Sequence, residues 1–211
     1  MKRFTSLLLT LLMLLNMVPA AYAAEPSGET VPTEINKDTV WSYLDNGTDP
    51  ATGSDDRTSW TAINFDDGTW KTGKGSFGAK NGKTNSLEGG YTPDTLLTQY
   101  KENGENGENI NIEAFFFRTD VMVEDASAVK AIEGRLIHDD SATLYINGTK
   151  VAGWGDDGVT ENLQYAANGH QDAPAAESIS ITDAEVLKLL ENGVNTIAVE
   201  IHQDRKASSD V

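Results

Sequence analysis

"RLIHDDSATLYINGTKVAGW", residues 135–154, predicts a β-hairpin. From Ala142 to Ile146 every second residue is apolar, which is the period of two of a half-buried strand. Asn147-Gly148 follows, and these residue types accept the positive φ angles that a type I′ turn requires. The chain then returns through Val151. The stretch therefore favours antiparallel β structure.

Two longer stretches alternate in the same way and predict half-buried strands. They are "AFFFRTDVMV", residues 114–123, and "GVNTIAVEIHQ", residues 193–203. One face carries Phe115, Phe117, Val121 and Val123 in the first strand and Ile197, Val199 and Ile201 in the second. The opposite face carries Phe116, Arg118, Asp120, Met122, Ala198, Glu200 and His202. We expect shorter strands in "AIEGRLI" (131–137) and around Trp41–Leu44 and Ala62–Phe65.

"TDAEVLKLLENG", residues 182–193, predicts the one short helix. Thr182 is the expected N-cap, Glu185 completes a capping box, and Gly193 follows the helix end. Many short strands, long loops rich in Gly, Asn, Asp and Thr, and a single helix predict an all-β fold, an antiparallel β-sandwich.

The N-terminus has the layout of a secretory signal peptide. Lys2 and Arg3 precede an apolar run at residues 7–18, and small residues stand at Ala21 and Ala23. A bilayer span needs about 20 apolar residues, so we expect cleavage and no membrane insertion afterwards. The sequence thus predicts a signal peptide at 1–23, a linker at 24–38, a domain at 39–211 and a secreted, extracellular protein.

The composition limits the classes of partner that this protein can bind. The formal net charge is −17, and it becomes more negative when the two basic residues leave with the signal peptide. Such a surface repels nucleic-acid backbones and anionic lipids. The chain has no Cys, so export does not depend on disulfides.

Four segments occur in an order that resembles the galactose-binding-domain-like jelly roll, as found at the N-terminus of family 2 glycoside hydrolases. These are "FDDGTWKTGKGSFG" (65–78), "AFFFRTDVMV" (114–123), "HDDSATLYINGTKV" (138–151) and "NGVNTIAVEIHQ" (192–203). The resemblance implies a jelly-roll β-sandwich over residues 40–211.

The "VEIHQ…SSD" ending is also similar to modules of secreted bacterial metallophosphoesterase-type multidomain proteins. There the module continues past Ser-Ser-Asp into another strand. We therefore expect the domain at 39–211 to lack its last strand and to be the front end of a longer bacterial polypeptide or a truncated copy of one.

No motif predicts catalysis by this chain. "GKGSFG" (73–78) spells a dinucleotide fingerprint, but no helix follows to hold a pyrophosphate. A G-x-S-x-G elbow, an H-E-x-x-H motif and Cys are absent. His138, His170 and His202 are too few for a two-metal phosphoesterase centre. We predict that this chain is not an enzyme and that any hydrolase domain follows it in a longer protein.

Two ligand classes are compatible with the side chains. The acidic loop gathers Asp45, Asp49, Asp55 and Asp56, oxygen ligands that suit a structural calcium ion, although a plain solvated loop explains them as well. Aromatic side chains stack on sugars, and the carbohydrate-binding candidates are Trp154, Trp60, Trp70, Tyr91 and the neighbouring Asp156, with Tyr165 near them. The alternative is that each aromatic belongs to the core or its rim. The cluster of His138, Asp139 and Asp140 is interpreted as a turn cap rather than a cation site.

The sequence predicts a non-catalytic ancillary module of a secreted bacterial multidomain hydrolase, with a metallophosphoesterase as one candidate parent. Its role would be domain packing or glycan targeting. The alternative is a free-standing secreted carbohydrate-binding protein.

Overall fold

The computed structural model describes residues 33–87, 90–101, 108–167 and 177–211. The predicted signal peptide and most of the linker lie outside these residues. Within them, no helix is long and apolar enough to cross a membrane.

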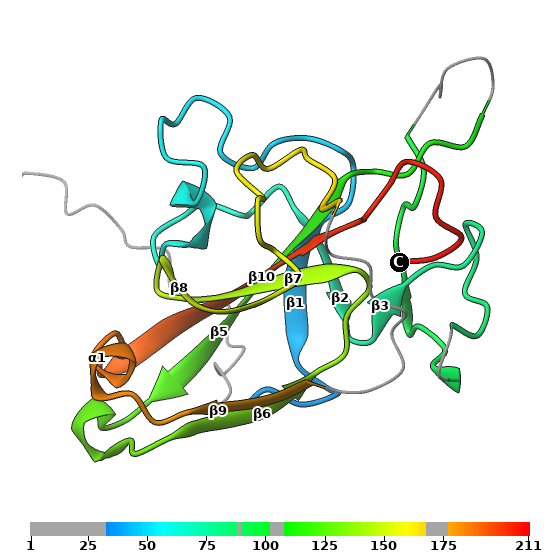
Figure 1. The fold of residues 1–211 in the computed structure, drawn as a ribbon. Helices are drawn as coiled ribbons and strands as arrows, with labels where there is room; N and C mark the ends of the chain where they lie inside the picture. The colour runs from blue at the N-terminus through cyan, green and yellow to red at the C-terminus, as the bar shows by residue number, and fades with distance from the viewer. Residues whose placement is uncertain (1–32, 88–89, 102–107, 168–176) are drawn as a thin grey trace, which may run out of the picture. The chain divides into compact units, whose positions relative to one another are not determined.

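A six-stranded sheet in the order β2-β1-β5-β10-β7-β8 forms the larger layer, and every pair in it is antiparallel (Figure 1). The central pair, β5 and β10, stays in register from Gly193 opposite Val123 to His202 opposite Ala114. The strands are β1 (Val40–Leu44), β2 (Lys71–Lys74), β5 (Ala114–Val123), β7 (Ser141–Ile146), β8 (Thr149–Trp154) and β10 (Gly193–His202).

The predicted hairpin is confirmed. β7 and β8 meet at Ile146 opposite Thr149, and both turn residues have positive φ, 49° at Asn147 and 88° at Gly148. The Asn147 amide also donates to the Leu189 carbonyl at 2.8 Å and to Asn195 Oδ1 at 2.7 Å. This side chain therefore ties the hairpin turn to the connection that enters β10.

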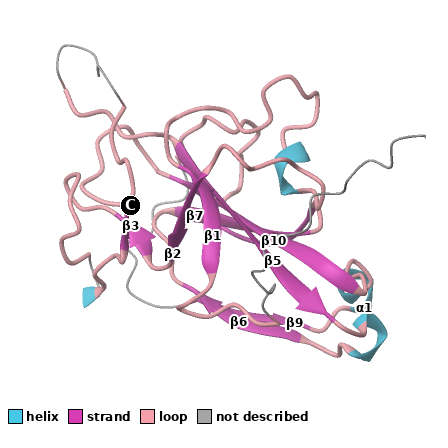
Figure 2. Ribbon diagram, turned by 180° about the vertical axis from the view of Figure 1, so that it is seen from behind, coloured by secondary structure: helices cyan, strands magenta, loops and turns pink. Residues whose placement is uncertain are grey.

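The second layer consists of two separate two-stranded ladders in the described chain. β6 (Ile132–Leu136) pairs antiparallel with β9 (Glu177–Ile181), and β3 (Phe77–Gly78) pairs parallel with β4 (Thr95–Leu96). Leu136, Ile179 and Phe77 pack against the hydrophobic cluster on one face of the large sheet. The ladder of β6 and β9 runs as its own layer below that sheet (Figure 2). The fold is an all-β sandwich, as predicted, with one parallel pair that the sequence did not indicate.

The C-terminal residues extend the second layer. Val211 and Ala79 exchange both backbone hydrogen bonds at 3.0 Å, and the Asn81 N–H donates to the Ser209 carbonyl at 2.7 Å. Residues 209–211 thus run antiparallel to residues 79–81, and the C-terminus lies beside β3 (Figure 1).

Two predicted elements were wrong in detail. Ala62–Phe65 is a turn after the 3₁₀ helix Ser59–Thr61, because the Phe65 N–H bonds back to the Ala62 carbonyl at 3.2 Å. The helix α1 covers only Ala184–Leu187, and its N-cap is Asp183, whose carboxylate accepts the Glu185 N–H at 2.8 Å.

Residues 114–119 of β5 and 198–202 of β10 are buried on both faces, which corrects the half-buried assignment for these parts of the strands. The first face carries Phe115 and Phe117, as well as Val199 and Ile201. The second face carries Phe116 and Ala198, and it is covered by Trp60, which is completely buried.

Arg118 holds the loop that carries Trp60 against the sheet. It donates to the Trp60 carbonyl and to Asp67 Oδ2 at 3.0 Å. Its guanidinium also lies 5.2 Å from the centre of the Phe65 ring. The period of two could not predict this burial, since it depends on a loop that folds over the strands.

Candidate functional site

Two regions of the sandwich differ from an ordinary core: a buried polar cluster on the second face and a groove on the first. The polar cluster consists of Arg57, Tyr145, Asn162, Glu200 and His202. The groove lies between the two layers and is called the interlayer groove below.

Glu200 is the centre of the polar cluster and is fully buried. Its Oε1 accepts from Arg57 Nη1 at 2.9 Å and from His202 Nε2, and its Oε2 accepts from the Tyr145 hydroxyl at 2.9 Å. Glu200 and His202, which the alternation places on one face of the strand, therefore form a hydrogen-bonded pair.

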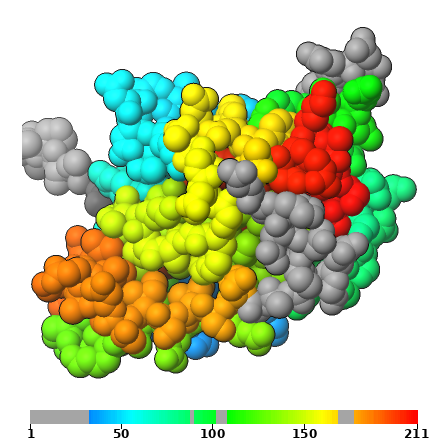
Figure 3. Space-filling model, viewed as in Figure 1, coloured from blue at the N-terminus to red at the C-terminus, as the bar shows by residue number. Residues whose placement is uncertain are grey.

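The polar cluster joins two distant loops to the sheet. Asn162 accepts from Arg57 Nη1 at 2.9 Å and donates to Asp49 Oδ1 at 2.7 Å. The Gln164 carbonyl lies 2.6 Å from His202 Nδ1. As a result the loops around residues 50–60 and 155–165 lie next to each other at one end of the sandwich, in cyan and yellow in Figure 3.

The protonation of the polar cluster fits a structural role. Burial alone would raise the pKa of Glu200, but the hydrogen bonds and charges of His202 and Arg57 outweigh it, so the pKa is lowered and the carboxylate stays ionised. Burial and the charge of Glu200 raise the pKa of Tyr145, which remains a phenol. Glu200 and His202 are both 0% exposed, so a substrate cannot reach either of them.

The interlayer groove has a volume of about 700 Å³. The large sheet supplies its floor, and β3, β6 and the segments beside them supply its walls. Its apolar lining comprises Trp41, Phe77, Leu87, Leu97, Phe115, Phe117, Leu136, Ile137, Val199, Ile201 and Val211.

His138 gives the groove one unusual polar group. Its ring is 8% exposed, and Nδ1 lies 2.9 Å from the Asp140 carbonyl, so Nδ1 is the donor. Nε2 is buried without a hydrogen-bond partner among the described residues. Burial lowers the pKa of His138, which favours the neutral ring with an accepting lone pair on Nε2.

The lining of the groove is mostly apolar, and the groove borders the hydrophobic cluster on the first face of the large sheet. Covering apolar surface of this kind with further polypeptide stabilises it by roughly 25 cal/mol per Å² removed from water.

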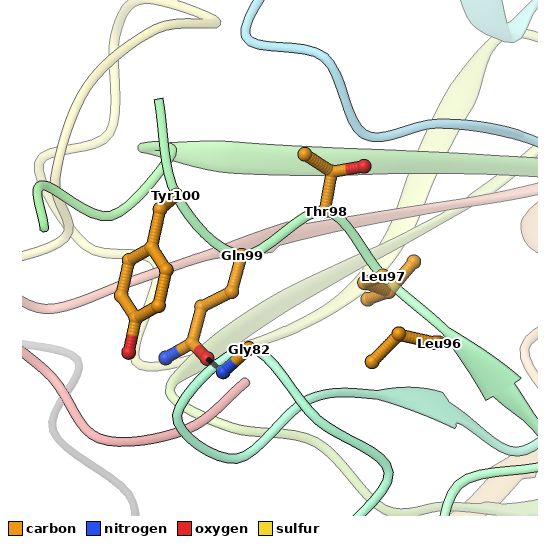
Figure 4. A pocket seen from close by; sticks show the side chains of 6 residues that line it. All are labelled: Gly82, Leu96, Leu97, Thr98, Gln99 and Tyr100. Atoms are coloured by element: carbon orange, nitrogen blue, oxygen red, sulfur yellow. Dashed lines mark hydrogen bonds between the residues drawn. The ribbon is translucent and has the colours of Figure 1, made fainter. Parts of the chain in front are cut away.

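A second, shallow cavity of about 290 Å³ is lined by Gly82 and by Leu96 to Tyr100 (Figure 4). The Gly82 N–H donates to Gln99 Oε1 at 2.7 Å, so the side-chain amide of Gln99 already holds the loop around Gly82. Gln99 and Tyr100 are its largest polar side chains, and no acid–base pair lines the cavity.

The predicted sugar-binding residues do not converge on one surface. Trp60 is in the core, 5.1 Å from the ring of Phe116, and Trp70 packs beside it at 6.1 Å. Trp154 is half-buried, with its ring 5.8 Å from that of His138, and Tyr91 lines the interlayer groove.

Asp156, the polar sugar-binding candidate beside Trp154, makes its contacts within the sheet. The Asp156 carboxylate accepts from the Thr143 hydroxyl at 2.6 Å and pairs with Lys150 at 2.7 Å. The Tyr165 hydroxyl donates to the Asn111 carbonyl at 2.7 Å.

The four predicted calcium ligands are likewise dispersed. Asp45 is 1% exposed, accepts the Thr98 N–H at 2.7 Å and pairs with Lys71 at 2.8 Å. Asp49 accepts from Asn162 and Asp56 from the Thr58 N–H, while Asp55 is exposed. No group of three or more His, Cys, Asp or Glu that could hold a metal occurs among the residues described, and a structural calcium ion stays a prediction.

Sequence reasoning missed both Arg57 and the interlayer groove. Arg57 stands in an acidic loop, where nothing in the local pattern distinguishes it from a solvated residue. The groove is made by segments from residue 35 to residue 211, so no single stretch carries its signal.

Among solved structures, the chain is similar to a β-glucuronidase from glycoside hydrolase family 2, with 16% identity over 82% of this chain and a TM-score of 0.45. The chain is similar to Bacteroides uniformis β-glucuronidase 2, with 19% identity over 82% of this chain and a TM-score of 0.47. It is also similar to the exo-chitosanase of Amycolatopsis orientalis (15% identity, 79% of this chain, TM-score 0.40) and to the Ruminococcus gnavus β-glucuronidase (13%, 82%, TM-score 0.38).

The chain spans only a part of those proteins: 14%, 15%, 16% and 22% of their lengths, respectively. No family model and no curated protein matches the sequence.

Proposed function

We propose that this chain is a non-catalytic ancillary module of a larger secreted hydrolase, and that it acts by packing against another part of the polypeptide. The observation that carries the proposal is the interlayer groove, an apolar cavity of about 700 Å³. Its apolar lining is stabilised when polypeptide covers it and removes it from water.

The side chains support packing over catalysis and over glycan targeting. The best acid–base group, the polar cluster around Glu200, is fully buried and engaged in hydrogen bonds. The aromatic candidates for sugar binding are divided between the core, where Trp60 lies, and the groove, where Tyr91 lies. Sugar binding normally requires an aromatic face that is open to the ligand.

The finer parts of the proposal rest on the sequence. Secretion rests on the signal-peptide pattern of residues 1–23, and a metallophosphoesterase parent rests on the "VEIHQ…SSD" segment. The free-standing carbohydrate-binding protein remains the rival, because Tyr91 and Asp94 line the groove, and an aromatic ring and a carboxylate are groups that bind sugars.

The gene itself provides the test. Sequencing downstream of the Val211 codon should reveal an open frame that encodes a His- and Asp-rich hydrolase domain. A stop codon at that point would overturn the proposed module role. Binding of the purified chain to a glycan array, abolished by Tyr91→Ala, would favour the rival.

A further inference from the structure

The tripeptide Asn-Gly-Thr occurs twice in the sequence, at residues 46–48 and 147–149. Asn-Gly is the dipeptide in which an asparagine side chain deamidates most readily, because the glycine has no Cβ to obstruct attack by its own nitrogen. Both glycines have positive φ angles, 70° at Gly47 and 88° at Gly148. The two copies therefore compare one reactive sequence in two structural settings.

The second copy is held by the fold. Asn147 Nδ2 donates to the Leu189 carbonyl at 2.8 Å and to Asn195 Oδ1 at 2.7 Å. Asn147 Oδ1 accepts the Thr196 N–H at 2.8 Å. Both donors of the side-chain amide and its oxygen are thus engaged. The Cγ atom cannot turn toward the Gly148 nitrogen unless the hairpin turn opens.

The first copy lies just after β1, and Asn46 is exposed. Asn46 Oδ1 accepts the Thr48 N–H at 3.1 Å and the Thr48 hydroxyl at 2.6 Å. The bond from the Thr48 N–H closes a ring that contains both the Asn46 Cγ and the Gly47 nitrogen, so it keeps these two atoms close together. The Asn46 Nδ2 makes no hydrogen bond to the described residues, in contrast to that of Asn147.

These contacts favour the cyclisation by which asparagine deamidates. The Gly47 nitrogen attacks the Asn46 Cγ, the bond between Cγ and Nδ2 breaks, and the Gly47 proton leaves with Nδ2 as ammonia. Negative charge develops on Oδ1 during the attack, and the two donors of Thr48 stabilise it there. Water then opens the five-membered imide at either carbonyl, which gives an aspartate or a β-linked isoaspartate.

We propose that Asn46 is a site of deamidation in the folded protein, that Thr48 promotes the reaction, and that Asn147 is protected from it. Water is the only co-reactant that the reaction needs. The proposal goes beyond the proposed function and does not depend on it.

The product changes the start of the acidic loop. Each conversion adds one negative charge, and the β-linked form also adds one carbon to the backbone between Asp45 and Asp49. Asp45 accepts the Thr98 N–H and Asp49 accepts from Asn162, so both residues hold this part of the loop in place. The same loop supplies Arg57 to the polar cluster, so the modification acts on a segment that closes the second face.

Peptide mapping by mass spectrometry measures both reactions in one sample of the purified chain, aged in mildly alkaline buffer. In the folded chain, Asn46 should be converted roughly tenfold or more faster than Asn147, because Asn147 reacts only after local opening. In concentrated urea the fold holds neither side chain, so the two rates should converge. A rate at Asn147 equal to that at Asn46 in the folded chain, or a difference that persists in urea, would overturn the proposal.

A matched pair of variants tests the part that Thr48 plays. Thr48→Val removes the hydroxyl but retains the backbone N–H, and it should slow the conversion of Asn46 by about threefold or more. Thr149→Val makes the same change at the exposed threonine of the second copy, and it should leave the rate at Asn46 unchanged. An unchanged rate in Thr48→Val would overturn the role assigned to Thr48.

Discussion

The two faces of the six-stranded sheet are built from the same strands but closed by different means. On the second face, loops cover Phe116 and Ala198, and the polar cluster fastens those loops through Glu200. On the first face, two short ladders leave an apolar groove of about 700 Å³ above Phe115 and Phe117. The comparison indicates that loops close the second face, and we propose that the first face is where the sandwich meets more polypeptide.

The largest expected effect is the loss of the carboxylate at the centre of the polar cluster. Glu200→Ala leaves Arg57 and His202 buried near each other without their shared acceptor, and it should lower the free energy of unfolding by about 3–5 kcal/mol. Urea unfolding measures this loss. Glu133→Ala, on an exposed position of β6, is the control and should change stability by less than about 0.5 kcal/mol. Equal losses in both variants would contradict the role of the polar cluster.

Adjacent phenylalanines of β5 compare the two faces within one strand. Phe116→Ala opens a cavity in the closed core and should cost about 3–5 kcal/mol. Phe117→Ala should cost about 1–2 kcal/mol less, because its side chain already borders the groove and loses fewer contacts. Denaturant titration of both variants gives the difference. A larger loss at Phe117 would mean that the first face is the better packed one.

Acidification should affect the two faces at different pH values. Burial lowers the pKa of His138 below its ordinary value of 6.5, so the unfolded chain binds that proton more readily and stability falls as the pH drops below 6.5. The pKa of Glu200 is lowered from 4.5, so its stabilisation is complete above 4.5 and is lost as the pH falls further, through its pKa in the folded chain.

Urea unfolding over a range of pH should therefore show two stages of loss. His138→Phe should remove the stage nearer neutrality, where Glu177 and Asp140 are the charged groups that act on the ring. Glu200→Gln should remove the more acidic stage, which also involves Arg57 and His202. A single stage that neither variant alters would contradict the assignment.

The smallest expected effect is that of calcium. Asp45 and Asp49 are already bonded to Lys71 and Asn162, and the four carboxylates of the acidic loop do not converge. Excess calcium or a chelator should therefore leave the thermal unfolding midpoint of the chain unchanged within about 1 °C. A calcium-dependent rise that Asp45→Asn abolishes would restore the calcium site predicted from the sequence.

Local sequence patterns predicted the strands well, but they did not predict which side chains on those strands are buried. The alternation in β5 and β10 and the Asn147-Gly148 turn were readable because each depends on neighbouring residues. The burial of Phe116 was not, because it depends on Trp60, which approaches from a distant loop. For the same reason Trp60 was assigned to a sugar site when it belongs to the core.

The candidate site was still harder to predict. The groove becomes apparent only when β3 and β6, which no described strand joins, are placed opposite the large sheet. The alternation places Glu200 and His202 on one face of the strand, which agrees with the hydrogen bond between them in the structure. The two loops that complete the polar cluster gave no signal in the sequence.

Residue-resolved amide hydrogen exchange of the chain tests most directly the claim that one face is closed and the other incomplete. The amides of β6 and β3, each in a two-stranded ladder, should exchange roughly 100-fold faster than those of β7 and β5 in the large sheet. Equal protection of the two layers would contradict the account, because it would mean that the sandwich is already complete without further polypeptide.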